Sequence, residues 1–140
     1  METEVIPQSV RKLVRSGYAH SPPKPGTRFE QVKSRDDYYS LLGLKLIEEL
    51  REFGDEINRD EVNLFRVKEE AADVLEVAET AKTYSDMTKE QLHSIQEDIF
   101  ERAGLLGVGK KEILEYQTMK RIELGGFSMG VVLIEEKKAS

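Results

Sequence analysis

Residues 41–57, LLGLKLIEELREFGDEI, decide what kind of fold this chain adopts. Apolar side chains recur here at intervals of three and four residues, which places them on one stripe of an α-helix at about 100° per residue. The stripe consists of Leu42, Leu46, Leu50, Phe53 and Ile57. Upstream, Ser34 followed by Asp37 resembles the capping box that begins many helices. We therefore expect a helix from about Asp36 to Ile57.

Three further helices are expected downstream. A pattern of apolar and small residues predicts the second helix over about 62–84. Thr88 and Gln91 form a capping box for the third. The fourth covers about 110–124, where Gly125-Gly126 stops it. A glycine pair at such a position ends a helix more often than it cradles a phosphate.

Strands are expected at only two places. Residues 28–33 read as a short edge strand, and Val131–Ile134 as a second short strand. Residues 1–27 hold all four prolines and are interpreted as an arm or loop. The predicted fold is a single domain over residues 1–140. It is an all-α, antiparallel bundle of about four helices with a short β element near the N-terminal arm and the C-terminus.

The composition excludes several classes of protein. The 140 residues carry a formal net charge of −6 and contain no cysteine, which excludes disulfides, zinc–thiolate sites and thiol nucleophiles. Residues 36–100 hold 7 basic and 18 acidic residues, and so acidic a segment repels a nucleic-acid backbone. No apolar run approaches the roughly 18 residues of a membrane span, and the chain does not begin like a signal peptide. A cytoplasmic protein without nucleic-acid or membrane partners is expected.

Two pairs of carboxylates are the most informative chemical feature. Glu49 and Glu52 lie three residues apart on the first predicted helix. Glu70 and Asp73 repeat that spacing on the second. A separation of three places both side chains of a pair on one helix face, about 60° apart. Each pair flanks the apolar stripe of its helix, and the short link between the helices suits an antiparallel hairpin. Packing the two helices core to core therefore brings the four carboxylates toward each other.

Two interpretations of these acids are weighed. A single acidic pair on a helix is more often a solvated face. Partly buried carboxylates, by contrast, are costly unless they take protons, basic partners or a metal ion. An oxygen-only set of ligands favours Mg²⁺ or Mn²⁺ over zinc, and such a site serves phosphoryl chemistry. His20 and His93 stand alone, and surface or capping roles are expected for both.

The carboxylates and their flanks resemble the all-α nucleotide pyrophosphohydrolases of the MazG type. Here Glu48–Glu52 (EELRE) is followed by Glu70–Asp73 (EAAD) after 17 intervening residues. Flanking stretches resemble one subgroup, the small predicted house-cleaning members related to phosphoribosyl-ATP pyrophosphohydrolase. These stretches are Lys12–Arg15, Asp37–Tyr39, Ala72–Val77 and Lys120–Leu133.

The resemblance implies hydrolysis of a nucleoside triphosphate between its α and β phosphates, giving the monophosphate and pyrophosphate. It implies a Mg²⁺ site, with Mn²⁺ as a substitute, at Glu49, Glu52, Glu70 and Asp73. Glu48 or Glu52 then orients the attacking water or takes its proton, and the sequence leaves open which. The expected phosphate contacts are Lys120, Arg15, Lys12 and Arg121. A homodimer or homotetramer is expected as well.

The chain departs from the family pattern in three places. Ser16-Gly17 stands where the opening motif usually continues with aspartate, and Leu124 stands where a basic residue usually precedes Gly-Gly-Phe. Residues from about 82 to 101 are interpreted as an inserted helix. The first two changes affect phosphate or base contacts, and the third affects the pocket mouth or the subunit interface. None touches the four carboxylates.

Two other functions stay open. The chain could keep the fold and the metal site yet only bind or sense a nucleotide. Alternatively, its acids pair with basic residues of another subunit, and the protein serves helical oligomerisation. Tyr38, Tyr39 and Phe127 are expected to pack in the core rather than stack on a base.

Overall fold

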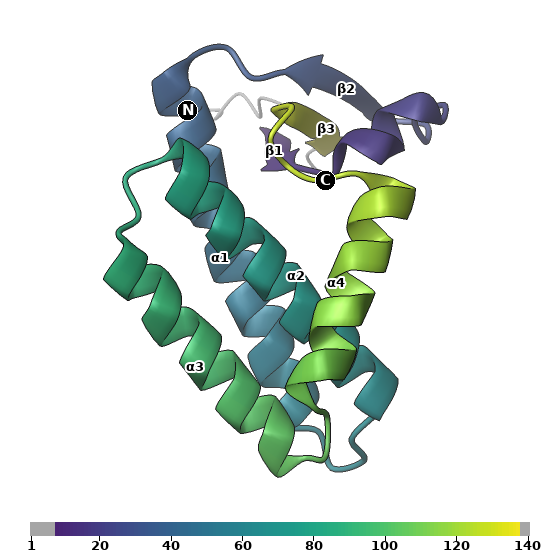
Figure 1. Ribbon diagram of the computed structural model, residues 1–140. Coiled ribbons are helices and arrows are strands. Elements are labelled where there is room, and N and C mark those ends of the chain that lie inside the picture. Colours follow the sequence, from purple (N-terminus) through teal and green to yellow (C-terminus); the bar gives the residue numbers. More distant parts are fainter. Residues whose placement is uncertain (1–7, 138–140) are drawn as a thin grey trace, which may run out of the picture.

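The computed structural model describes residues 8–137, and this part of the chain holds four α-helices and three β-strands. The helices are α1 (Arg35–Ile57), α2 (Leu64–Tyr84), α3 (Lys89–Leu105) and α4 (Lys110–Leu124). Successive helices run in opposite directions, and α2 contacts α1, α3 and α4 (Figure 1). No helix within residues 8–137 combines the length and the apolar character that crossing a membrane requires.

Polar side chains fix where three of these helices begin. The Ser34 hydroxyl accepts a hydrogen bond from the Asp37 backbone N–H at 3.1 Å, and α1 follows. Asn63 plays the same part for α2. Thr88 and Gln91 form the reciprocal capping box predicted for α3. Each cap satisfies a backbone N–H that has no partner inside its helix, so the helix bounds follow the capping residues closely.

The sheet is larger than the sequence predicted. Its antiparallel strands lie in the order β1 (Gln8–Leu13), β3 (Val131–Lys137) and β2 (Thr27–Gln31). The segment 1–27 was expected to be an arm, but its described part contains β1 and the 3-10 helix η1 (Ser16–His20). Residues 1–7 lie outside the described residues. Because β1 has the polar sequence QSVRKL, only its pairing with β3 makes it a strand. The chain is therefore mostly helical with a small sheet, and not purely α.

Two clusters of buried side chains form the core. The larger joins the helices and includes Phe53, Val67, Val74, Leu75, Ile99 and Ile113. The smaller joins the sheet to α1 and α2 and includes Leu13, Tyr38, Leu42, Val77, Phe127 and Val132. α1 and α2 contribute to both clusters, and α2 is the helix that contacts the three other helices.

Candidate metal centre

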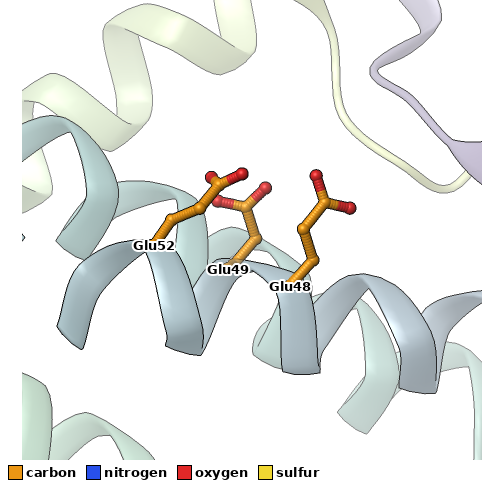
Figure 2. Close-up of side chains that lie close together, drawn as sticks. All are labelled: Glu48, Glu49 and Glu52. Atoms are coloured by element: carbon orange, nitrogen blue, oxygen red, sulfur yellow. The ribbon is translucent and has the colours of Figure 1, made fainter. Parts of the chain in front are cut away.

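The two acidic pairs converge. Carboxylate oxygens of Glu49, Glu70 and Asp73 all lie within 4.8 Å of one another. A second group at the same separation joins Glu49 to Glu48 and Glu52, whose side chains leave α1 in the same direction (Figure 2). The helix-face argument from the i, i+3 spacing therefore describes the geometry correctly, and Glu49 is the carboxylate common to both groups.

Burial leaves two of these carboxylates short of partners. Glu49 is 4% exposed and Glu70 is 9% exposed. Among the described residues, neither the Oε2 atom of Glu49 nor that of Glu70 has a hydrogen-bond donor. A buried carboxylate oxygen without a hydrogen-bond donor costs free energy, so these two atoms favour the binding of a proton or a cation.

The same burial shifts the proton affinity of both groups. Desolvation raises the pKa of Glu49 to about 7, although the charge of Lys45 opposes the shift. Desolvation also raises the pKa of Glu70 to about 9, with further contributions from a hydrogen bond with Glu52 and the charge of Glu49. Without a cation, these sites therefore compete for protons near neutral pH.

The donor set fits a hard divalent cation. Every candidate ligand atom is a carboxylate oxygen, which suits Mg²⁺ or Mn²⁺. The two orphaned oxygens are free to take a ligand without breaking a hydrogen bond. Of the two histidines, His93 lies on α3 and pairs with Glu97, so it belongs to the helix surface as expected.

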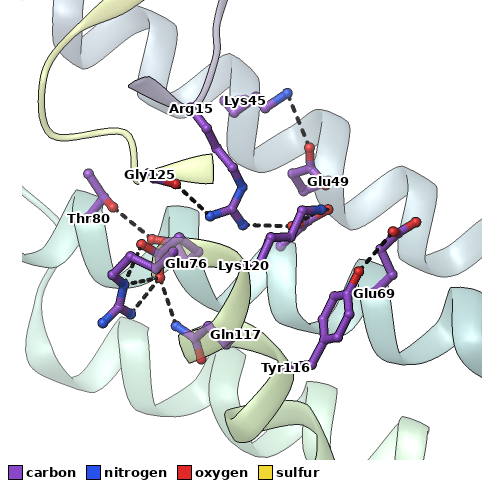
Figure 3. A network of polar contacts seen from close by, with 12 residues as sticks. Arg15, Lys45, Glu49, Glu69, Glu76, Thr80, Tyr116, Gln117, Lys120 and Gly125 are labelled. Carbon is purple, nitrogen blue, oxygen red and sulfur yellow. Dashed lines mark hydrogen bonds and ion pairs between the residues drawn. The ribbon is translucent and has the colours of Figure 1, made fainter. Parts of the chain in front are cut away.

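Asp73 differs from its neighbours because two cations, Arg15 and Lys120, already hold it. Figure 3 shows the side chains of both cations. The Arg15 guanidinium donates to Asp73 Oδ1 at 2.8 Å. Lys120 Nζ, which comes from α4, donates to both oxygens at 2.8 and 2.9 Å. Arg15 is only 3% exposed, and it also donates to the Gly125 carbonyl at 3.0 Å and lies over the Phe127 ring. Two of the predicted phosphate contacts are thus fixed at the edge of the cluster.

Lysines hold the other side of the cluster. Lys45 Nζ lies 3.2 Å from Glu49 and 3.5 Å from Glu48. Lys12, a predicted phosphate contact, lies 4.0 Å from Glu48. The sequence argument missed Lys45, although its spacing of three and four residues from Glu48 and Glu49 is the spacing of helical ion pairs. Glu48, Glu49 and Asp73 thus have basic partners within the same chain, and the hypothesis of partners from another subunit stays a prediction.

Arg121, the fourth predicted phosphate contact, pairs with Glu76 and not with the carboxylates of the cluster. Its guanidinium makes a bidentate contact to Glu76, with distances of 2.6 to 3.0 Å. Gln117 also donates to Glu76, at 3.0 Å. Burial raises the pKa of Glu76, but these hydrogen bonds outweigh it and hold that pKa below its ordinary value. Arg121 therefore ties α4 to α2 away from the acidic cluster.

The aromatic and glycine candidates have structural roles. The Tyr38 hydroxyl donates to the Phe127 carbonyl at 2.8 Å, and both side chains are buried, as expected for core residues. Tyr39 accepts from Arg35 at 2.7 Å and packs, partly buried, against the smaller core cluster. Gly125 has φ +77° at the end of α4, which is the helix stop that the sequence predicted.

No protein-family model, no curated protein and no solved structure matches this chain. We therefore infer the function from the carboxylate cluster and the cations around it.

Proposed function

We propose that this protein is a Mg²⁺-dependent nucleoside triphosphate pyrophosphohydrolase of the MazG type. It splits its substrate between the α and β phosphates, gives the monophosphate and pyrophosphate, and clears noncanonical nucleotides from the cytoplasm. The observation that carries this proposal is the convergence of Glu49, Glu70 and Asp73, with two buried carboxylate oxygens that lack donors. Oxygen donors of this kind hold the metal ions of phosphoryl-transfer sites.

The four carboxylates at Glu49, Glu52, Glu70 and Asp73 are the proposed ligands, and Mn²⁺ is a substitute for Mg²⁺. A bound Mg²⁺ supplies charge neutralisation for the triphosphate and makes water more acidic. The remaining chemistry needs positioning more than covalent catalysis, so the absence of cysteine is no obstacle.

Residues of the chain itself take the proton and hold the phosphates. Glu48 or Glu52 accepts a proton from the attacking water, whose oxygen joins phosphorus as the bridging oxygen between the α and β phosphates leaves. The side chain of Glu48 is 33% exposed, so water reaches it. Arg15 and Lys120 exchange part of their contact with Asp73 for phosphate oxygens, and Lys12 adds a third positive charge near Glu48.

The finer features of the family are part of the same proposal. The four alternating helices form the antiparallel bundle of a single domain, and α3 is the helical insertion, which overlaps the expected segment of about 82–101. The chain forms a homodimer or homotetramer. Large apolar side chains exposed on α4 support association, because an uncovered apolar surface is a common contact between subunits. They are Leu114, Met119 and Ile122.

Pyrophosphate release tests the proposal. The wild type is expected to release pyrophosphate from at least one member of an NTP and dNTP panel at millimolar Mg²⁺. Glu49→Ala and Asp73→Ala are expected to abolish release, and Glu101→Gln, at an exposed position on α3, is expected to keep it. A folded wild type that releases no pyrophosphate from any nucleotide would contradict the enzyme proposal.

A second candidate is a nucleotide-binding module that does not turn its ligand over. It is favoured by Asp73, which is already neutralised by Arg15 and Lys120 and so can order the site without a metal ion. Tight nucleotide binding with no pyrophosphate release, in the same buffer, would select this candidate.

A further inference from the structure

The sheet has two faces, and only one packs on the helices. Leu13, Val132 and Ile134 are buried against α1 and α2 in the smaller core cluster. Successive strand residues point to opposite faces, so Lys12 and Leu133 point the other way. The register pairs Leu133 with Lys12 on one side and with Phe29 on the other. Lys12, Leu133 and Phe29 therefore form one row across the second face of the sheet.

A pocket of about 420 Å³ lies over this row. Its far wall is η1 and the loop that follows, including Tyr18, Pro22 and Pro23. The volume lies in the range of small-molecule sites, and the lining combines aromatic and apolar surface with a few amines and hydroxyls. Nothing in the proposed chemistry of the carboxylates uses Tyr18 or Phe29.

Two lysines join this pocket to the acidic cluster. Lys45 lines the pocket, and its Nζ atom lies 3.2 Å from Glu49. Lys12 lines it as well and reaches to 4.0 Å from Glu48. A ligand that spans both places therefore has an aromatic or apolar part in the pocket and an anionic part at the lysines and carboxylates.

The wall that carries Tyr18 is held firmly against the end of α4. The Ser16 backbone N–H donates to the Gly126 carbonyl at 2.9 Å. At Gly17, a Cβ atom would lie 2.4 Å from the Leu124 carbonyl oxygen, so only glycine permits this approach. Lys120, which pairs with Asp73, lies in the last turns of α4. The C-terminal end of α4 therefore positions both Lys120 and the wall that carries Tyr18.

We propose that this pocket binds the nucleoside of the substrate, with the base against Tyr18 and Phe29 and the phosphates directed past Lys12 and Lys45 to the carboxylates. The phosphate end of this arrangement rests on the proposed function. An aromatic ring suits the role because every base presents a π face, and stacking on it does not depend on a particular hydrogen-bond pattern.

The test measures binding separately from turnover. The α,β-methylene analogues of ATP, GTP, CTP and UTP, and inorganic tripolyphosphate as the probe without a nucleoside, are titrated into the full chain with Mg²⁺ by calorimetry. For the analogue that binds best, Tyr18→Ala is expected to weaken binding about tenfold, as loss of a stacked ring does. Tyr18→Phe keeps the ring and is expected to stay within about threefold. Tripolyphosphate binding is expected to be unchanged in both variants.

Tyr84→Ala is the matched control, because Tyr84 is 51% exposed and Tyr18 is 47% exposed, and Tyr84 does not line this pocket. It is expected to leave analogue binding unchanged. Ser21→Trp, at an exposed pocket residue, fills the space by a second route and is expected to weaken analogue binding if Tyr18→Ala fails to fold.

Three results would overturn the inference. The first is normal analogue binding by Tyr18→Ala or, if that variant does not fold, by Ser21→Trp. The second is a loss of tripolyphosphate binding by the variant equal to its loss of analogue binding, and the third is no analogue binding by the wild type. Pyrophosphate release by the wild type is measured in parallel. If the wild type releases pyrophosphate and the pocket variants bind the analogue normally, the nucleoside pocket is refuted and the enzyme proposal stands. If analogue binding depends on Tyr18 but the wild type releases no pyrophosphate, the enzyme proposal is refuted and the nucleoside pocket stands.

Discussion

Glu49 on α1 and Glu70 on α2 each bury an Oε2 atom that has no hydrogen-bond donor within the described residues, and their carboxylates lie within 4.8 Å of each other. Two acids placed in this way oppose folding unless a proton or a cation joins them. Metal-free, the cluster therefore lowers the stability of the folded protein, and binding of the proposed cation would restore it.

Replacement of Glu70 by glutamine should separate stability from function. Glu70 is exposed to water in the unfolded chain, so burying its carboxyl group on folding costs free energy, whether the group is ionised or takes up a proton. The neutral amide of glutamine carries no charge to bury and can donate hydrogen bonds to the neighbouring carboxylates. We expect Glu70→Gln to raise the melting temperature of the metal-free protein at pH 8 by roughly 3–6 °C, which corresponds to about 1 kcal/mol. The same variant should lose the stabilisation by Mg²⁺ and the release of pyrophosphate. Thermal unfolding with Mg²⁺ or a chelator measures both effects, with Glu101→Gln as the control; a lower melting temperature would contradict this account.

The metal-free protein should lose stability as the pH rises. Glu49 and Glu70 have pKa values raised to about 7 and about 9 in the folded state, from the ordinary value of 4.5. Between about pH 4.5 and pH 9 the folded state therefore binds more protons than the unfolded state. The contribution of these two groups to stability is greatest below about pH 4.5 and falls as the pH rises. We expect melting temperatures in a chelator to fall from pH 5 to pH 9, and saturating Mg²⁺ to remove most of that fall. Equal slopes with and without Mg²⁺ would count against a metal site here.

Asp73 and Lys120 should give different results although they touch each other. Asp73→Asn leaves the Arg15 side chain, 4% exposed, without its carboxylate partner, and loss of one partner of a buried pair costs about 3 kcal/mol. Lys120→Met leaves Asp73 paired with Arg15, so we expect a cost of about 1 kcal/mol or less. Urea unfolding measures both. Steady-state kinetics of Lys120→Met should show a KM for the nucleotide raised about tenfold, as expected for a lost phosphate contact.

Asp37 should stabilise the junction of β1 with α1 in a pH-dependent way. Arg11 makes two hydrogen bonds of 2.8 Å to its carboxylate, and these bonds, with one from the Lys33 backbone, lower the pKa of Asp37 from its ordinary value of 3.8. A lowered pKa means that the contribution is present above about pH 4 and is lost as the pH falls further. We expect Asp37→Asn to melt below the wild type at pH 7, with a difference that begins to shrink below about pH 4 and disappears only when the pH falls through the lowered pKa of the folded state. A constant difference at all pH values would argue against this ion pair.

Two glycines should respond in opposite ways to alanine. At Gly43, inside α1, a Cβ meets nothing within 4 Å, so Gly43→Ala is expected to stabilise the helix by about 0.5–1 kcal/mol. At Gly17, the Cβ would lie 2.4 Å from a backbone oxygen, and Gly17→Ala is expected to destabilise the protein by about 2 kcal/mol. Urea unfolding of both variants measures the difference, and a neutral Gly17→Ala would show that η1 is free to move away from α4.

Local sequence predicted the helices well because each carries its own signals. The stripe from Leu42 to Ile57, the capping box at Thr88 and the stop at Gly125 act within a few residues, so the bounds of α1 and α4 could be expected closely. β1 was missed because nothing within QSVRKL favours a strand. Its partner, β3, begins more than a hundred residues later in the chain.

The sequence by itself determined which face of each helix carries the acids, because a spacing of three residues fixes a direction on any α-helix. Only the tertiary structure decided which cations meet them. Lys120 and Arg121 are neighbours about 100° apart on α4, so the rotation of that one helix sends Lys120 to Asp73 and Arg121 to Glu76. Arg15 and Lys45 reach the cluster because the sheet and α1 pack on α2, and no local pattern specifies how packed elements are oriented.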